Sequence, residues 1–162
     1  MSAYVDALTL LGRRELSERQ LRQRLARKGH AESEIDEAIA RLTAERALDD
    51  RRTADAIART EALVRRRGRL RVRQALERAG IAPGIAKTAI DAAFADQDEE
   101  AAAEAALVRR LREDRPIADD REFQRLYRYL VSRGFESDRA LRVLRSRRRA
   151  RASGGDSPED VP

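Results

Sequence analysis

An internal repeat constrains the fold of this chain more than any other feature. Two apolar residues four positions apart, followed four positions later by glycine, occur three times: Leu21-x-x-x-Leu25-x-x-x-Gly29, Val72-x-x-x-Leu76-x-x-x-Gly80 and Leu126-x-x-x-Leu130-x-x-x-Gly134. This spacing is typical of one face of an α-helix that ends at a glycine cap. A helical unit used three times predicts an extended scaffold that recognises a surface, and does not indicate a fold that encloses a substrate.

Each glycine is followed by a further helical pattern, as in Ile35, Ala38, Ile39 and Leu42 after Gly29. A helical pattern also precedes each repeated motif, so the unit contains three helices. It is short in the first unit, where it ends near Arg14, and long in the second, where one helix carries Ala54, Ile57 and Ala58 and ends near Gly68. We therefore expect an all-α fold of three tandem three-helix repeats in an elongated, solenoid-like array. The predicted repeats span residues 1–47, 48–96 and 97–152, and residues 153–162 form a disordered Gly, Ser, Pro and acidic tail.

The composition agrees with a helical protein and excludes several classes of site. Charged residues make up 40% of the chain, aromatic residues make up 4%, and cysteine is absent. Disulfides, thiolate metal sites and cysteine nucleophiles are therefore excluded. We find no apolar run near the roughly 20 residues of a membrane span and no signal-peptide pattern, so we expect a cytoplasmic protein without a membrane partner.

The chain is basic, with a net charge of +6, and Lys28 and Lys87 are its only lysines. Arginine favours recognition of phosphate and carboxylate groups, although a GC-rich coding sequence explains an arginine excess equally well. We assign the candidate partner-binding residues, for a protein or for DNA phosphate, to the densest run and to its counterpart in the first repeat: Arg65, Arg66, Arg67, Arg69, Arg71, Arg73, Arg24, Arg27 and Lys28. The alternative is a solvated face, partly neutralised by pairs such as Arg73 with Glu77.

Catalytic and metal-binding chemistry has no support in the sequence. Asp49-Asp50 and Asp119-Asp120 each stand at an expected helix start, where carboxylates cap backbone amides and complement the helix dipole. His30 is the only histidine, and no serine lies in a nucleophile motif. We therefore expect neither an enzyme, nor a cofactor, nor a metal site.

Several motifs in order resemble the RecX family of recombinase regulators over roughly residues 4–146. They are Ala7-Leu8 to Leu11 with Arg14-Glu15-Leu16-Ser17, Leu21 to Gly29, Leu48-Asp49-Asp50-Arg51 with Ala54, Gly68 to Gly80-Ile81, and Tyr129-Leu130-x-x-Arg133-Gly134-Phe135. One departure is Thr53, because an aromatic residue commonly follows the Leu-Asp-Asp stretch in that family. This departure concerns local packing.

The resemblance implies a curved regulator of recombination and DNA repair in the SOS response. The oligomeric state stays open, and we expect a monomer because a repeat array that caps its own ends needs no partner. Such a protein would bind in the groove of a RecA filament on single-stranded DNA, and most family members would inhibit its ATPase and strand exchange. Direct contact with single-stranded DNA stays open, as does the sign of the effect. The alternative function is an architectural nucleic-acid-binding helical repeat that acts without a recombinase.

Overall fold

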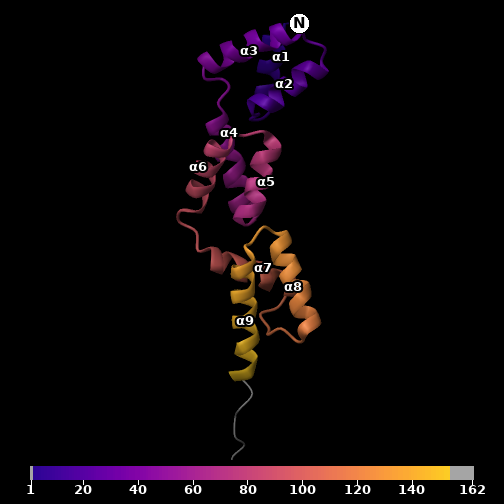
Figure 1. The fold of residues 1–162 in the computed structure, drawn as a ribbon, viewed down its shortest axis with the longest axis vertical. Helices are drawn as coiled ribbons and strands as arrows, with labels where there is room; N and C mark the ends of the chain where they lie inside the picture. Colours follow the sequence, from indigo (N-terminus) through magenta and orange to yellow (C-terminus); the bar gives the residue numbers. More distant parts are fainter. Residues whose placement is uncertain (1, 154–162) are drawn as a thin grey trace, which may run out of the picture. The chain divides into compact units, whose positions relative to one another are not determined.

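A computed structural model describes residues 2–153, with side chains through Arg149. These residues form nine α-helices and one π-helical segment, with no β-strand among them, so the all-α prediction is confirmed (Figure 1). The helices are α1 (Ala3–Leu11), α2 (Glu18–Arg27), α3 (Glu32–Ala44), α4 (Asp50–Arg59), α5 (Arg69–Ala79), α6 (Pro83–Phe94), α7 (Glu99–Leu111), α8 (Asp120–Ser132) and α9 (Ser137–Ser153). The predicted disordered tail lies outside the described residues except for Ser153, at which α9 ends.

The chain divides into two compact units. The first comprises Met1–Arg65 and Val72–Ala95, and the second comprises Arg66–Arg71 together with the residues from Asp96 onward. The short basic segment Arg66–Arg71 therefore packs with α7, α8 and α9, although it belongs to the middle repeat in sequence. No helix in the described part of the chain is both long enough and apolar enough to cross a bilayer.

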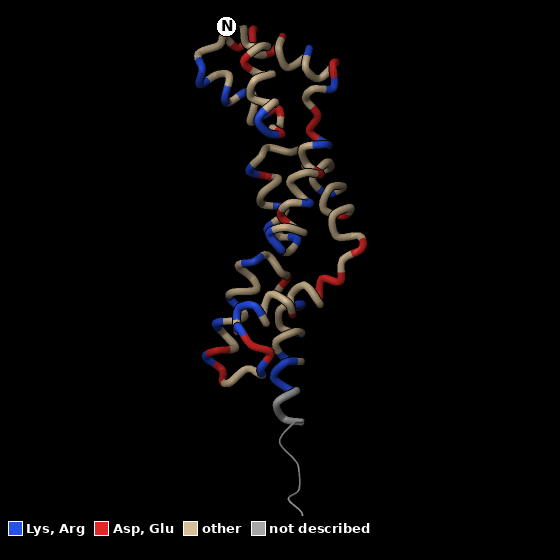
Figure 2. The backbone as a smooth tube through the Cα atoms, turned by 180° about the vertical axis from the view of Figure 1, so that it is seen from behind, with Lys and Arg blue, Asp and Glu red and all other residues tan. Residues whose placement is uncertain are grey.

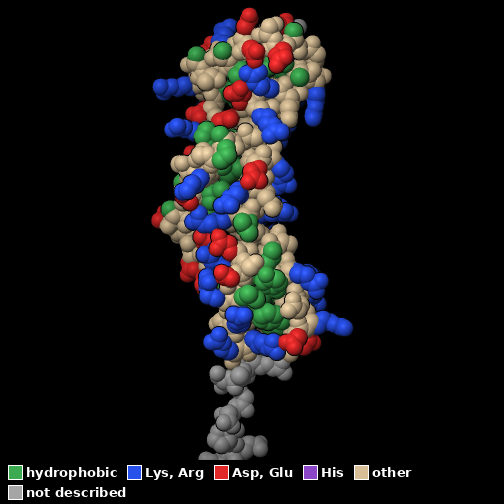
Figure 3. Space-filling model, in the orientation of Figure 1, with side chains coloured by type: hydrophobic (Ala, Val, Ile, Leu, Met, Phe, Trp, Pro, Cys, Tyr) green, Lys and Arg blue, Asp and Glu red, His purple; other side chains and the backbone are tan. Residues whose placement is uncertain are grey.

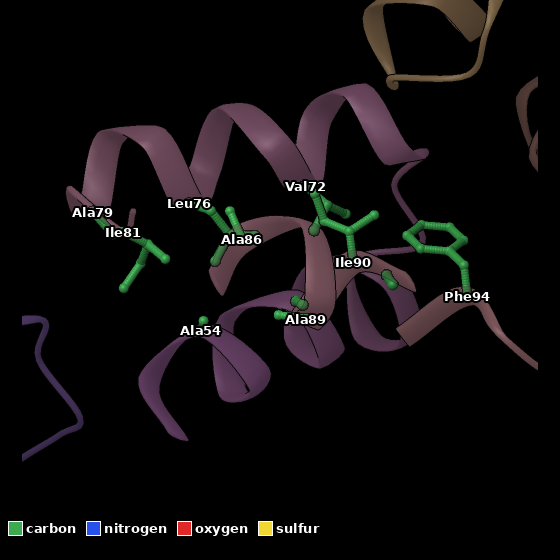
Figure 4. Packing of buried hydrophobic residues seen from close by; sticks show 11 residues of the cluster. Ala54, Val72, Leu76, Ala79, Ile81, Ala86, Ala89, Ile90 and Phe94 are labelled. Atoms are coloured by element: carbon green, nitrogen blue, oxygen red, sulfur yellow. The ribbon is translucent and has the colours of Figure 1, made fainter. Parts of the chain in front are cut away.

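The first unit contains two hydrophobic clusters, one for each of its groups of helices. The cluster of α1, α2 and α3 consists of Ala7, Leu16, Leu21, Leu25, Ile35, Ile39, Leu42 and Leu48. In the other, Val72 and Leu76 of α5 point toward Ile90 and Ala86 of α6, and Ala54 approaches from α4 (Figure 4). Alanine supplies much of this second cluster, which allows α4 and α6 to pack closely.

The second unit is built around α9, which packs against both α7 and α8. Its cluster consists of Ala103, Ala106, Leu107, Ile117, Leu126, Leu130, Phe135, Ala140, Val143 and Leu144. Pro116 lies in the loop between α7 and α8, as expected from its inability to continue a helix. Each of the three repeats thus contributes helices to a cluster of its own.

The three repeated glycines end α2, α5 and α8 in the left-handed conformation that the sequence predicts. Their φ values are +91° at Gly29, +77° at Gly80 and +93° at Gly134. Glycine adopts this region without the steric penalty of a β-carbon. The chain therefore turns sharply after the second helix of every repeat.

The Gly80 turn is covered by the start of α2, in a contact that we call the Gly80 junction. The Ser17 hydroxyl donates a hydrogen bond to the Ala79 carbonyl oxygen, and the Arg19 side chain lies against the α-carbon of Gly80. The Glu18 amide also donates to Asp50 Oδ1 at 2.8 Å. Ser17 closes a capping box with Gln20 as well, so one side chain satisfies polar groups of two helices.

The Gly134 turn is covered in the same way by the segment before α5, in a contact that we call the Gly134 junction. The Gly68 amide donates to the Arg133 carbonyl oxygen at 2.9 Å, and the Leu70 amide donates to the Gly134 carbonyl oxygen at 3.2 Å. Gly68 holds the position in its repeat that Ser17 holds in the first. The repeat therefore reproduces a contact between helices as well as the helices themselves.

Two local features differ from the sequence-based expectation. A single long helix was predicted to end near Gly68, but α4 ends at Arg59, a π-helical segment follows (Thr60–Val64), and Arg66 takes a left-handed φ of +52°. Apolar periodicity does not distinguish one extra residue per turn, so no pattern in the sequence predicts this π-helix. At the second feature, Thr53 is buried, and its hydroxyl donates to the Leu16 carbonyl oxygen at 3.2 Å.

Candidate partner-binding surface

The structure separates the densest arginine run into three environments. Arg65 ends the π-helical segment in the first unit, the four arginines from Arg66 to Arg71 belong to the second unit, and Arg73 lies on α5 in the first unit. Figure 2 shows that Lys and Arg occur along the backbone among Asp and Glu, so the basic residues do not form an uninterrupted zone.

Arg69 is held inside the second unit by an acidic partner. Its Nε lies 2.8 Å from Glu99 Oε1, and Arg139 Nη1 lies 2.5 Å from the other oxygen of the same carboxylate. The side chains of Glu99 and Arg139 are 13% and 20% exposed. Arg69 therefore joins the start of α5 to α7 and α9, and its charge is largely balanced there.

Arg65 and the half-buried Arg67 and Arg71 also take part in interactions within the protein. Arg65 Nη1 lies 2.9 Å from Glu61 Oε1, and this glutamate side chain is only 8% exposed. Arg67 and Arg71 each take part in an interaction as well. These three arginines are therefore engaged in contacts within the protein.

Arg66 and Arg73 are the members of the run that face solvent without an ion-pair partner among the described side chains. The backbone carbonyl of Arg66 accepts a hydrogen bond from Arg133 Nη2 at 3.3 Å, which leaves its guanidinium outside this contact. The expected Arg73–Glu77 pair is not formed. These two guanidinium groups keep their charge available to a partner.

The three candidate cations of the first repeat, Arg24, Arg27 and Lys28, also differ in whether they have an ion-pair partner. Lys28 Nζ lies 2.7 Å from Asp6 Oδ1, and His30 Nε2 lies 2.7 Å from Asp6 Oδ2. The Lys28 ammonium, and then His30, hold the pKa of the Asp6 carboxyl below its ordinary value. Arg24 is half-buried and Arg27 is exposed, and neither has an ion-pair partner among the described side chains.

Exposed apolar side chains accompany this basic surface, and the sequence analysis did not single them out. Leu63 is 54% exposed and Val64 is 76% exposed, both on the π-helical segment immediately before Arg65. Figure 3 shows hydrophobic side chains at the surface between Lys and Arg side chains. Apolar residues next to cations are typical of protein-binding surfaces, whereas a phosphate-binding groove requires only the charges.

The paired aspartates act as helix caps. Asp49 Oδ1 accepts from the Arg51 amide at 2.9 Å, and Asp119 Oδ1 accepts from the Glu122 amide at 2.7 Å. Among the residues described, His, Asp and Glu form no group of three that could hold a metal ion.

The basic end of α9 is also partly structural. Arg147 is 8% exposed and lies 2.7 Å from Asp114 and 2.5 Å from Glu104, in both cases through Nη2. Its Nη1 donates to the Arg115 carbonyl oxygen at 2.9 Å. Arg147 therefore fixes the loop between α7 and α8 against α9.

Comparison with known proteins places this architecture in one family. Residues 3–42 match the first three-helix domain of RecX, and residues 97–144 match its third three-helix domain. The regulatory protein RecX of Halorhodospira halophila is 34% identical over 155 residues, covering 95% of this chain and 88% of that protein. The regulatory protein RecX of Acidithiobacillus ferrooxidans is 36% identical over 140 residues, covering 85% of each chain.

The solved structures agree on the fold. A crystal structure of RecX from Lactobacillus salivarius matches with a TM-score of 0.73 at 19% identity, covering 89% of this chain and 93% of that one. A second crystal structure of a regulatory protein RecX gives the same TM-score at 22% identity, with 70% of that chain covered. By the sequence matches and by the fold, this chain belongs to the RecX family of regulatory proteins.

Proposed function

We propose that this protein binds the filament that a RecA recombinase forms on single-stranded DNA, and that it inhibits the filament's ATPase and strand exchange without being an enzyme itself. Membership of the RecX family is the observation that carries the proposal. Exposed arginines without internal partners support it, because a filament of protein and DNA presents both carboxylates and phosphates to such groups.

The proposed contact surface is narrower than the nine candidate residues. Arg69 is committed to Glu99 and Lys28 to Asp6, so replacing either would disturb the fold as well as any contact. Arg66 and Arg73 have exposed guanidinium groups without ion pairs among the described side chains. We therefore assign one filament contact to Arg66 in the second unit and, separately, another to Arg73 in the first unit, which also carries the exposed Leu63 and Val64.

The test is the single-stranded-DNA-dependent ATPase of the cognate RecA, measured at fixed salt while this protein is added. Suppression at fewer than one molecule per RecA subunit is the expected result. A variant carrying both Arg66→Glu and Arg73→Glu should then need at least ten times more protein for the same suppression. The matched control is Arg59→Glu with Arg109→Glu, which makes the same change in charge at two exposed arginines without ion pairs among the described residues.

Two results would contradict the proposal at different levels. Equal inhibition by the double variant and its control would remove Arg66 and Arg73 from the contact surface. An unchanged ATPase, together with salt-sensitive binding of this protein to bare DNA, would select the architectural nucleic-acid-binding function instead.

A further inference from the structure

The Gly29 turn is the one repeated glycine turn that no described residue covers. A β-carbon placed on Gly29 would have no atom within 4 Å, whereas one on Gly80 or Gly134 would collide with Arg19 or Arg71. Gly29 itself is exposed, while Gly134 is buried and Gly80 is half-buried. The three turns share a backbone conformation but differ in whether another segment lies on them.

The two covered turns show which kind of segment fits such a turn. In both, the start of a helix approaches, and its first residues donate hydrogen bonds to the carbonyl groups that end the other helix. The donor is the Ser17 hydroxyl at the Gly80 junction and the Gly68 amide at the Gly134 junction. A small cap residue, serine or glycine, is therefore what brings the two backbones close enough.

The acceptor at the Gly29 turn is present and unused. Lys28 holds the position that Ala79 and Arg133 hold in the other repeats, and among the described residues no donor reaches its carbonyl oxygen. A carbonyl at a helix end that lacks a partner in the protein is left to water or to a ligand. The turn thus has the geometry of the two junctions and lacks only the incoming helix.

The corresponding helix starts of a second copy of this chain do not supply that helix. Its Ser17 and Gly68 are already placed at the Gly80 and Gly134 junctions. The corresponding position in the third repeat is Glu122, and α8 starts before it, at Asp120. Glu122 is buried. Its Oε1 lies 2.7 Å from Arg115 Nη2, and its Oε2 accepts a hydrogen bond from the Ala118 amide at 2.8 Å, so this helix start is not available to another chain.

The charges around the Gly29 turn further define the partner. Arg24 and Arg27 lie on the last turn of α2 without ion-pair partners among the described side chains. Acidic residues are favoured in the first turn of helices, where they complement the helix dipole. The turn is therefore complementary to a helix start with a serine, threonine or glycine cap and acidic residues directly after it.

We propose that the Gly29 turn is a docking site for the first turn of an acidic, small-residue-capped helix on a subunit of the recombinase filament. The incoming helix repeats at the protein's own surface the contact made inside it at Gly80 and Gly134. The identity of the partner rests on the proposed function, whereas the geometry of the site rests on the two junctions.

The experiment compares two equal substitutions at exposed glycines. Gly29→Asn adds a side chain over the open turn, and asparagine tolerates a left-handed backbone better than other side chains. Gly84→Asn is the control, since Gly84 also has open space around it and lies in the first turn of α6 and not in one of the repeated glycine turns. Affinity for the RecA filament on single-stranded DNA should fall at least tenfold for Gly29→Asn and change less than twofold for Gly84→Asn.

A second comparison uses charge, at matched positions of two repeats. Arg27 and Arg78 are equivalent and both exposed, but only the turn next to Arg27 is open. Arg27→Glu should weaken filament binding at least fivefold, and Arg78→Glu should leave it within twofold. Equal effects would point to general electrostatic attraction and would overturn the docking site.

Hydrogen exchange of the unaltered protein gives a measurement that does not depend on any variant folding. Binding to the filament should slow exchange in residues 26–31, which contain the open turn. If the wild-type protein binds and inhibits but residues 26–31 exchange unchanged, the docking site is wrong and the proposed function stands. If the wild-type protein does not bind the filament, the proposed function and the docking site both fail.

Discussion

Gly68 and Gly134 approach each other so closely that neither backbone has room for a β-carbon. A β-carbon on Gly68 would overlap the Gly134 carbonyl and lie 2.6 Å from the Phe135 amide nitrogen. Backbone atoms cannot move aside as a flexible side chain does. The start of α5 and the end of α8 are therefore joined by direct hydrogen bonds between main chains.

We expect Gly68→Ala to lower the free energy of unfolding by about 2 kcal/mol or more, because overpacking against a fixed backbone costs about 1–3 kcal/mol. Chemical denaturation measures the change. Gly84→Ala is the control, since its β-carbon would meet no atom, and in a helix this replacement stabilises by about 0.5–1 kcal/mol. Similar losses for both variants would contradict the close approach at Gly134.

Ser17→Ala removes a cap and a buried hydrogen bond together. Ser17 accepts from the Gln20 amide and donates to the Ala79 carbonyl oxygen, and its side chain is fully buried. We expect a loss of about 2–3 kcal/mol in the free energy of unfolding, since a cap contributes about 1 kcal/mol and a buried unsatisfied carbonyl costs about 1–3 kcal/mol.

Ser2→Ala is the matched control for Ser17→Ala. Ser2 caps α1 through the Val5 amide but is exposed, and its hydroxyl forms no hydrogen bond with another helix among the described residues. Its loss should stay near the roughly 1 kcal/mol of a cap alone. Equal losses for the two serines, measured by the same denaturation, would show that the Gly80 junction adds no stability.

The Glu122 carboxylate makes the free energy of unfolding depend on pH. Hydrogen bonds from Arg115 and then from the Ala118 amide lower the pKa of the Glu122 carboxyl from 4.5 to about 2. The charged form therefore stabilises the folded state above about pH 4.5, and this contribution is lost as the pH falls toward 2. The difference in unfolding free energy between the wild-type protein and Glu122→Gln should shrink over that range, and a difference independent of pH would contradict the assignment.

Thr53 occupies a position at which the resemblance leads one to expect an aromatic residue. The contribution of Thr53 at this position is the hydrogen bond that its hydroxyl donates. Thr53→Val keeps the shape but removes the donor to the Leu16 carbonyl, so we expect a loss of about 1–2 kcal/mol. Thr53→Ser keeps the hydroxyl and loses one methyl group, at a cost of about 1 kcal/mol. Thermal unfolding measures which of the two variants is less stable. A larger loss of stability for Thr53→Ser than for Thr53→Val would show that packing, and not the hydrogen bond, is decisive.

Local signals in the sequence predicted the helices and their ends. Gly29, Gly80 and Gly134 take positive φ values because each follows a helical apolar pattern that needs a left-handed end. The capping box of Ser17 with Gln20, and Pro83 at the first turn of α6, are local signals of the same kind, since caps act within three or four residues. The paired aspartates, too, were correctly interpreted as caps.

The sequence by itself determined the all-α class, the repeat and the family, because periodicity, caps and motif order are all local properties of the chain. Only the tertiary structure decided which charges are committed, since it places Glu99 against Arg69 and Asp6 against Lys28 across 30 and 22 residues. It also decided that two glycine turns are covered and the Gly29 turn is open. Contacts between residues far apart in the chain depend on how the helices pack, which no local pattern encodes.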